Sequence, residues 1–322
     1  MKYWHYVLCT AVCGLSQPAI SHAESPAGQE YSSQNYECCP QSCYVEPCCA
    51  PESGELAYSP LRLNVEGLVG TGIGGNNENA AVELFWAPSL VSESWLPFID
   101  LKWHHLGTSS CWAANAGVGL RGLDPWDRTM GINIFYDHRY NRGTEFNQVG
   151  IGLESLGELI DVRVNGYFPF KKTGTSTVLF DDYVGDYFVE AEQFWLPMSG
   201  VDAEVGVTMY NACDFRIYGA IGPYYYWNTD NQTSFEKKNA FGGMARFSVQ
   251  WTDYVTLEVK ATYDNLFKTK VQGLLEITLP FEKCFDACRW TSNACANIFL
   301  KPVERREVIV LHHSDILWLG NY

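Results

Sequence analysis

The stretch from Gly131 to Phe170 constrains the fold most, because apolar and polar residues alternate along it in three consecutive segments. A period of two places every second side chain on the same face of a β-strand. One face would be polar and carry Asn133, Asp137, Arg139, Glu154, Asp161, Arg163 and Asn165. The other would be apolar and carry Ile132, Ile134, Tyr136, Val149, Ile151, Leu153, Val162 and Val164. A sheet with ionised groups along one face needs water there and an apolar medium on the other, which a membrane β-barrel provides.

The first 23 residues have the three parts of a secretion signal. Lys2 supplies the positive charge, residues 6–15 the apolar core, and residues 21–23 (Ser-His-Ala) a small-residue cleavage site. No later run approaches the ~20 apolar residues of a transmembrane helix. The sequence therefore predicts an exported chain that would cross a membrane as strands.

Composition agrees with a membrane barrel and argues against a nucleic-acid partner. The formal net charge is −15, whereas a protein that binds phosphate backbones needs a basic surface. Aromatic residues make up 15% of the chain and charged residues 18%. This balance is typical of a barrel whose outer face contacts lipid and carries aromatic rings at both interfaces. We expect outer-membrane lipid as the main partner and the outer membrane as the location.

Thirteen segments have a strand-like pattern and follow one another without an intervening helix. Single-chain bacterial barrels normally have an even number of strands, so we predict an all-β antiparallel barrel of about 12 strands. The Gly-rich segment 61–73 and the poorly alternating segment 187–194 are the two candidates for exclusion, and 169–186 is predicted to be a long polar loop. The segments are 61–73, 80–87, 97–106, 112–122, 129–140, 147–155, 159–168, 187–194, 201–210, 214–222, 240–251, 255–264 and 270–280.

Charged residues on the polar faces are predicted to line a lumen. Burying such charges in a dry core would cost several kcal/mol each unless they were paired, and a wet or salt-bridged lumen avoids that cost. A one-sided soluble sheet with an outward polar face is the alternative, and it fits any single hairpin better than it fits the whole series. The predicted lumen-facing residues are Asp100, Lys102, Asp161, Arg163, Asp202, Glu204, Arg216, Arg246, Glu258 and Lys260.

Ten of the twelve cysteines lie outside the signal, and most of these fall into two clusters. Their spacing does not match a zinc finger or ribbon, so no metal site is predicted. Export to an oxidising compartment favours disulfides. Intramolecular bonds and cross-links to other envelope proteins both remain open. The disulfide candidates are Cys38, Cys39, Cys43, Cys48, Cys49, Cys284, Cys288 and Cys295.

The chain divides into four parts on this evidence: signal peptide 1–23, Cys-rich periplasmic linker 24–60, barrel 61–281 and Cys-bearing post-barrel segment 282–322. The three cysteines of the last part would share one side of a helix over Phe281–Ala296. That helix would lie either in the lumen or in the periplasm. After Pro302, residues 303–313 are predicted to be extended.

Several motifs, in order, resemble one family. They are the Phe-Tyr-Asp strand end at 135–137, Gly-x-Gly-x-Glu at 150–154, Asn-Gly-Tyr-Phe-Pro at 165–169, the strand start at 199–206, and Leu-Pro-Phe at 279–281. Together they resemble the β-domain of inverse autotransporters, the intimin and invasin type. The resemblance implies a 12-stranded barrel in a Gram-negative outer membrane, a periplasmic N-terminus and a post-barrel segment that threads the lumen.

The expected function departs from that of the family in one respect. Family members carry an adhesive passenger of immunoglobulin-like domains after the barrel, whereas this sequence ends at Tyr322. We therefore expect a barrel without a passenger that has a structural, anchoring or surface-interaction role. The alternative is a small porin, whose charged lumen residues would tune the passage of ions or small solutes.

No catalytic, cofactor or metal site is predicted. Glu154 with Asp161, and Asp202 with Glu204, could form carboxylate pairs for acid–base chemistry. Each of them lies on the polar face of an alternating strand, where a carboxylate is more simply part of a lumen lining. The sequence therefore does not indicate an enzyme.

Overall fold

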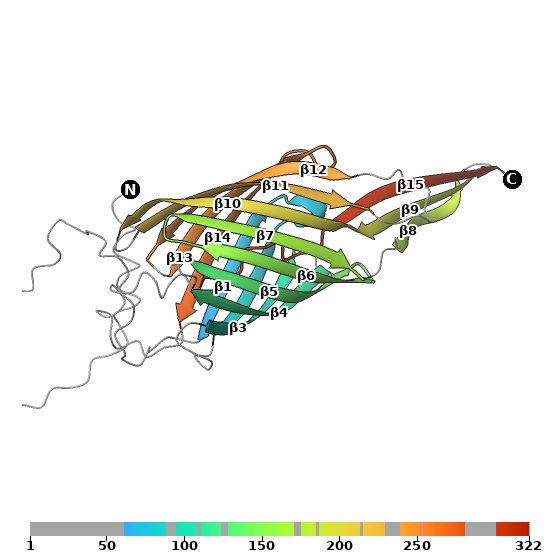
Figure 1. Ribbon diagram of the computed structural model, residues 1–322. Helices are drawn as coiled ribbons and strands as arrows, with labels where there is room; N and C mark the ends of the chain where they lie inside the picture. The colour runs from blue at the N-terminus through green and yellow to red at the C-terminus, as the bar shows by residue number, and fades with distance from the viewer. Residues whose placement is uncertain are drawn as a thin grey trace, which may run out of the picture. The chain divides into compact units, whose positions relative to one another are not determined.

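The computed structural model describes residues 61–87, 95–107, 111–123, 128–170, 175–184, 187–212, 215–228, 239–252, 254–280 and 301–321. These residues form strands joined by turns, with a single short 3-10 turn, η1 (Ile73–Gly75) (Figure 1). The strands are β1 (Leu61–Gly70), β2 (Asn79–Trp86), β3 (Trp95–Leu106), β4 (Cys111–Leu123), β5 (Thr129–Asn141), β6 (Thr144–Leu156), β7 (Ile160–Pro169), β8 (Thr175–Val184), β9 (Tyr187–Pro197), β10 (Ser199–Ala212), β11 (Phe215–Trp227), β12 (Ala240–Trp251), β13 (Val255–Asp264), β14 (Lys270–Pro280) and β15 (Leu311–Asn321).

Twelve of these strands close into a barrel. Their order around the wall is β1-β14-β13-β12-β11-β10-β7-β6-β5-β4-β3-β2, and β2 pairs with β1 to complete the ring. Every neighbouring pair is antiparallel, including β1 with β14, the first and the last wall strand in the sequence. The predicted antiparallel barrel of about 12 strands is therefore confirmed.

The two faces of the wall follow the alternation in the sequence. On β5, Ile132 is 53% exposed, whereas the next side chain, Asn133, is 4% exposed. Apolar side chains outside and polar side chains inside are the reverse of the arrangement in a soluble protein. This arrangement continues along β6 and β7. An outward apolar band of this kind is what a lipid bilayer requires of a barrel.

The barrel has two distinct ends. The near end is defined here as the one where the wall begins and finishes, at Leu61 of β1 and Pro280 of β14. The far end is the opposite one, where β1 finishes at Gly70 and β14 begins at Lys270. The chain leaves β7 and enters β10 at the far end.

Between β7 and β10 the chain forms a hairpin that does not belong to the barrel. Strands β8 and β9 pair with each other, and β15 pairs with the other edge of β9, which gives a separate sheet of order β15-β9-β8 (Figure 1). Segment 187–194 is thus the excess strand of the thirteen, while 61–70 belongs to the wall. The expected loop 169–186 contains β8, because its Thr and Val residues suit an extended chain even though the segment is polar overall.

The last described part of the chain enters the lumen. Residues 301–310, named here the lumen segment, are neither helix nor strand, bend at Arg305 and Val308, and lead directly into β15. The helix predicted over Phe281–Ala296 lies outside the described residues. Among the residues that are described, no helix is long and apolar enough to span a membrane.

Candidate functional site

The lumen segment contacts wall strands along its whole length. Near its start, the guanidinium of Arg121 on β4 donates to the carbonyl of Lys301 at 2.6 Å. Near its finish, Arg139 on β5 donates to the carbonyl of Ile309 at 2.5 Å. Arg121 lies close to the near end and Arg139 close to the far end. The segment therefore runs from the near end of the barrel to the far end.

Apolar side chains of the segment pack into separate pockets of the wall. Val303 joins Phe85, Phe98 and Phe135. Further along, each of the next apolar residues packs against a different set of wall residues: Val308 with Leu106, Cys111 and Ala113; Ile309 with Phe146; Val310 with Ile73, Tyr167, Met198, Tyr224, Tyr226, Ala240 and Met244. The three consecutive residues 308–310 thus close the far end with apolar contacts on several sides.

Arg305 makes the closest ionic contact between the segment and the wall. Its guanidinium donates to both oxygens of Asp137 on β5, through Nη1 at 2.9 Å and through Nη2. The same guanidinium lies over the ring of Phe135, 4.3 Å from its centroid. Gly150 makes room for it, because a Cβ there would come within 2.6 Å of the Arg305 Nη2 atom. Bidentate pairs of this type combine strength with a fixed geometry.

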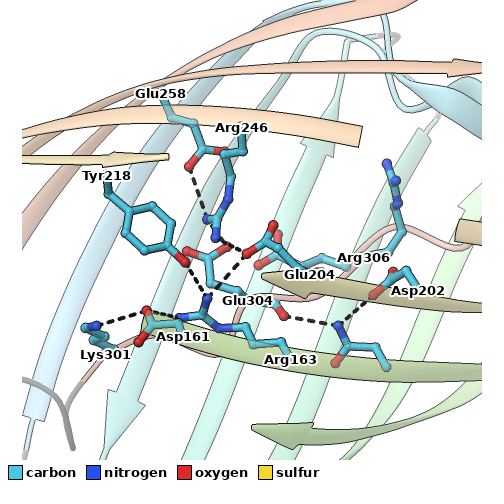
Figure 2. Close-up of polar contacts among 12 residues, drawn as sticks. Asp161, Arg163, Asp202, Glu204, Tyr218, Arg246, Glu258, Lys301, Glu304 and Arg306 are labelled. Atoms are coloured by element: carbon cyan, nitrogen blue, oxygen red, sulfur yellow. Dashed lines mark hydrogen bonds and ion pairs between the residues drawn. The ribbon is translucent and has the colours of Figure 1, made fainter. Parts of the chain in front are cut away.

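Glu304 joins a second ionic network on the opposite side of the segment (Figure 2). Its carboxylate lies 2.6 Å from Nη1 of Arg246 on β12. Arg246 also contacts Glu204 on β10 at 2.5 Å and Glu258 on β13 at 3.3 Å. Glu204 in turn pairs with Arg163 on β7 at 3.3 Å. One guanidinium thus links the segment to three strands of the wall.

The network continues toward the near end. The Oδ2 atom of Asp161 lies 3.1 Å from Nη2 of Arg163 and 3.2 Å from Nζ of Lys301. The hydroxyl of Tyr218 accepts a hydrogen bond of 2.9 Å from Arg163. Each of these charges is therefore compensated inside the barrel, as buried charges must be if the fold is to be stable.

Glu307 anchors the segment to the β1–β4 side of the wall. Nζ of Lys102 lies 2.7 Å from the Glu307 carboxylate and 2.5 Å from that of Glu66. The amide of Asn115 donates to the Glu307 carbonyl at 2.7 Å. Charged residues 304, 305 and 307 therefore contact three different parts of the wall, and a single pass of the chain occupies the lumen.

The lumen is not packed equally on all sides. The inward residues of β3–β7 are buried, whereas Ser248, Gln250, Thr256, Glu258 and Lys260 of β12 and β13 are half-buried. The side chain of Glu304 is 42% exposed although it lies within the barrel. Farther along the same strands, Met244, Thr262 and Asp264 are buried. The inward faces of β12 and β13 are therefore less closely covered toward the near end than toward the far end.

The residues chosen from the sequence as lumen-facing lie as follows. Seven are buried among the contacts described above or beside them, and three are half-buried. The structure brings Asp161, Arg163, Glu204, Arg246 and Glu258 into one network. Asp202 accepts instead from Asn165 and Tyr167, each at 2.9 Å. The buried seven are Asp100, Lys102, Asp161, Arg163, Asp202, Glu204 and Arg246, and the half-buried three are Arg216, Glu258 and Lys260.

The sequence prediction missed the partners that the lumen segment supplies. Glu304, Arg305 and Glu307 lie in the densest charge run after the barrel, directly before an apolar run that ends at Leu311. That order matches a charged middle and an apolar end of the lumen. This order could have indicated that the segment enters the lumen, because the charged residues of the wall need partners of opposite charge.

Three of the four candidate carboxylates, Glu154, Asp161 and Glu204, form ion pairs, and the fourth, Asp202, accepts hydrogen bonds from neutral groups. Glu154 accepts from Nε of Arg121 at 2.6 Å, and Asp161 is paired as described. Among the described residues, no cluster of His, Cys, Asp and Glu has the geometry of a metal site. All eight disulfide candidates lie outside the described residues. The described cysteine, Cys111, is a buried free thiol whose Sγ lies 3.1 Å from Oδ1 of Asn141.

The protein is a closed twelve-stranded barrel with an apolar exterior, and a later part of its own chain occupies the lumen. These features place it in the class of outer-membrane barrel proteins. The family model for the inverse autotransporter β-domain matches residues 73–274. The chain therefore belongs to the inverse autotransporter β-domain family, which confirms the resemblance seen in its motifs. It lies in the outer membrane, and its outer face contacts lipid.

One solved structure shares the fold, and two others are reported as weaker likenesses. A membrane protein described in work on in-meso crystallization is 19% identical, with a TM-score of 0.55 over 79% of this chain and 100% of that one. The NanC porin is 11% identical, with a TM-score of 0.37 over 67% of this chain and 98% of that one. The translocator domain of the autotransporter NalP from Neisseria meningitidis is 10% identical, with a TM-score of 0.27 over 69% and 87%. A search of the curated proteins gave no match.

Proposed function

We propose that this barrel is an outer-membrane anchor which is sealed by its own lumen segment and which holds β15 at the far end for a structural or surface-interaction role. The observation that carries the proposal is the set of contacts between residues 301–310 and the wall. They combine ion pairs in the middle of the lumen with apolar packing at its far end. The family implies that the near end is periplasmic, so the far end would face outward.

The proposal favours an anchor over a porin because of what occupies the pore. A 12-stranded barrel is of intermediate size, and one pass of the chain with its side chains takes up much of that lumen. The wall charges that a porin would offer to ions are instead bonded to the segment, as Lys102 is to Glu307 and Arg246 to Glu304. Conduction would require those contacts to break.

Single-channel recording in a planar bilayer tests this proposal. We expect the full chain to be silent and a variant lacking residues 282–322 to conduct, because the truncation empties the lumen. A variant lacking only 311–322 is the matched control, since it keeps the lumen segment and should stay silent. Heat-modifiable mobility on gels would verify that each variant has a folded barrel. Reproducible conductance steps from the full chain would overturn the anchor and support the porin.

The division of the chain belongs to the same proposal. Residues 1–23 would be a cleaved signal peptide, 24–60 a Cys-rich periplasmic linker, 61–281 the barrel and 282–322 the post-barrel segment. The eight candidate cysteines of the linker and the post-barrel segment would form disulfides, either within the chain or with other envelope proteins. No catalytic role is assigned, because Glu154, Asp161 and Glu204 act as partners of Arg and Lys side chains and Asp202 accepts from Asn165 and Tyr167.

A further inference from the structure

Strand β15 is an edge strand of the sheet β15-β9-β8 (Figure 1). It pairs with β9 along its whole length, from Leu311 opposite Pro197 to Asn321 opposite Tyr187. In the part of the chain that the structure describes, no strand lies along its other edge. The backbone N–H and C=O groups of alternate residues in such a strand point away from its one partner. β15 therefore carries a row of hydrogen-bonding groups that a further strand could use.

The edge of β15 lacks the features that usually prevent such pairing. Edge strands are commonly protected by a short length, by proline or lysine, or by a bulge. β15 has 11 residues without Pro or Lys, and it pairs with β9 without a shift in register. β8, the opposite edge strand of the sheet, differs because its register shifts between Val178 and Phe180. Of the two edges, that of β15 is thus better suited to accept another strand.

Much of β15 lies away from the point where the sheet joins the wall. β9 has 11 residues and leads from Pro197 into wall strand β10. A strand of that length spans roughly 35 Å at about 3.3 Å per residue. The second half of β15, from Ile316 to Asn321, pairs with the half of β9 that is farther from Pro197. A partner could therefore reach this half without displacing a wall strand.

The three strands of this sheet are acidic. Asp181 on β8 lies directly opposite Glu190 on β9. Like charges at opposite positions destabilise a sheet, so a cation beside them would be favourable. A second copy of β15 would bring further negative charge instead. The sequences of the three strands contain no Lys or Arg, and their carboxylates are Asp181, Asp182, Glu190, Glu192 and Asp315.

We propose that the free edge of β15 binds an extended, basic segment of a partner protein, which adds a strand to the sheet. Main-chain hydrogen bonds to β15 supply the affinity, and Lys or Arg side chains of the partner complement the acidic sheet. This inference rests on the proposed function, because the lumen segment has to hold β15 at the far end. The partner thus belongs to the compartment outside the far end.

Fluorescence anisotropy of a labelled peptide with the detergent-purified full chain tests this edge. The probe is a synthetic peptide of alternating Lys and Val, which is basic and suited to a strand. We expect saturable binding of one peptide per chain, and no binding to the variant that lacks residues 311–322. A peptide with Glu in place of Lys should bind far more weakly. The Lys peptide with N-methylated backbone amides keeps its charge but loses its donors, so it should also bind far more weakly.

Substitutions in the sheet test the contribution of charge. Asp315→Asn with Glu190→Gln removes two of its carboxylates and should weaken binding by about three- to tenfold. The matched control is Glu78→Gln with Glu145→Gln, the same loss of charge at two exposed positions outside the sheet. This control should leave the affinity unchanged. Heat-modifiable mobility on gels would verify that each variant has a folded barrel.

Single-channel recording on the same preparations separates this inference from the anchor. Equal affinity for the N-methylated peptide, equal binding by the variant lacking 311–322, or no saturable binding to a silent full chain would each overturn the docking edge alone. Conductance steps from the full chain would overturn the anchor whether or not the peptide binds. Association of full chains with one another that the variant lacking 311–322 does not show would assign the edge to a second copy and overturn the basic partner.

Discussion

At the scale of single residues, the lumen is organised by charge pairing between wall and segment. Asp137 is fully buried, and its carboxylate accepts hydrogen bonds from Arg305, Asn115 and Gln148. A buried carboxylate with this many donors depends on them, because an unpaired charge in a dry environment is strongly destabilising. The pair between Asp137 and Arg305 should therefore matter more than any exposed ion pair of the barrel.

We expect Arg305→Met to lower the free energy of unfolding by about 3–5 kcal/mol, since it leaves Asp137 buried without its cation. The measurement is the midpoint of the heat-modifiable gel shift, or of urea-induced unfolding in detergent. Arg142→Met, the same change at an exposed position, should cost less than about 0.5 kcal/mol.

The double variant Asp137→Asn with Arg305→Met distinguishes pairing from simple loss of packing. It should recover a large part of the lost stability, because both charges are then gone. Additive losses in the double variant would show that the ion pair is not the reason for the effect.

Residue positions of the wall were predictable from the sequence, whereas their partners were not. Alternation places Asp161 and Arg163 on one face of a strand, and the need for water or pairing places that face inward. Which carboxylate meets which cation depends on the barrel register and on the segment that enters later in the chain. Glu304 and Arg305 carry no alternation of their own that would link them to Arg246 or Asp137.

At the scale of elements, the sheet β15-β9-β8 is the feature that strand counting could not resolve. β9 has an edge partner on each side, yet neither partner belongs to the barrel. Its sequence resembles a wall strand of poor alternation, and its true partner β15 lies more than a hundred residues later. The local alternation of residues predicts that a strand exists at β9. Its pairing with β15, which is distant in the sequence, depends on the path of the lumen segment.

The attachment of β15 can be tested without touching the barrel. Among the described strands β15 pairs with β9 alone, so one of two consecutive N–H groups must point toward that strand. We expect a double substitution, Ile316→Pro with Leu317→Pro, to detach this part of β15, because proline removes the donor and cannot continue the ladder. Limited proteolysis should then cut within 311–321, while the heat-modifiable shift stays unchanged.

A control for the same experiment changes two residues in the turn after β13. The substitution Lys268→Ala with Thr269→Ala leaves the sheet β15-β9-β8 intact and should not alter the cleavage pattern. Equal resistance to protease in the proline variant and the wild type would mean that β15 is held by contacts other than its pairing with β9.

At the scale of the whole molecule, covalent linkage to other chains remains a prediction. Five of the candidate cysteines lie between Cys38 and Cys49, ahead of the barrel. If they cross-link neighbouring chains, non-reducing gels of intact envelopes should show a ladder of oligomers. Replacing these five by Ser should remove the ladder, whereas Cys111→Ser, at a buried free thiol, should preserve it. A wild-type sample without a ladder would contradict cross-linking.

The overall architecture was more predictable than its interior. The number of wall strands, their antiparallel order and the family all follow from alternation and from a few ordered motifs. The residues alone left the filling of the lumen open, because a barrel wall is compatible with an empty or an occupied interior, and only the family resemblance implied a segment that threads it.

The path of the lumen segment has a mechanical consequence. Residues 301–310 run from the near end to the far end. Their contacts with Asp161, Asp137 and Lys102 follow one another along this path. Tension applied to β15 from outside would act along the segment, so these contacts would be sheared together and would not open one at a time. The rate of extraction would then be set by the simultaneous rupture of several buried charge pairs, which is slow. A chain arranged in this way keeps hold of whatever its far end is attached to under pulling forces.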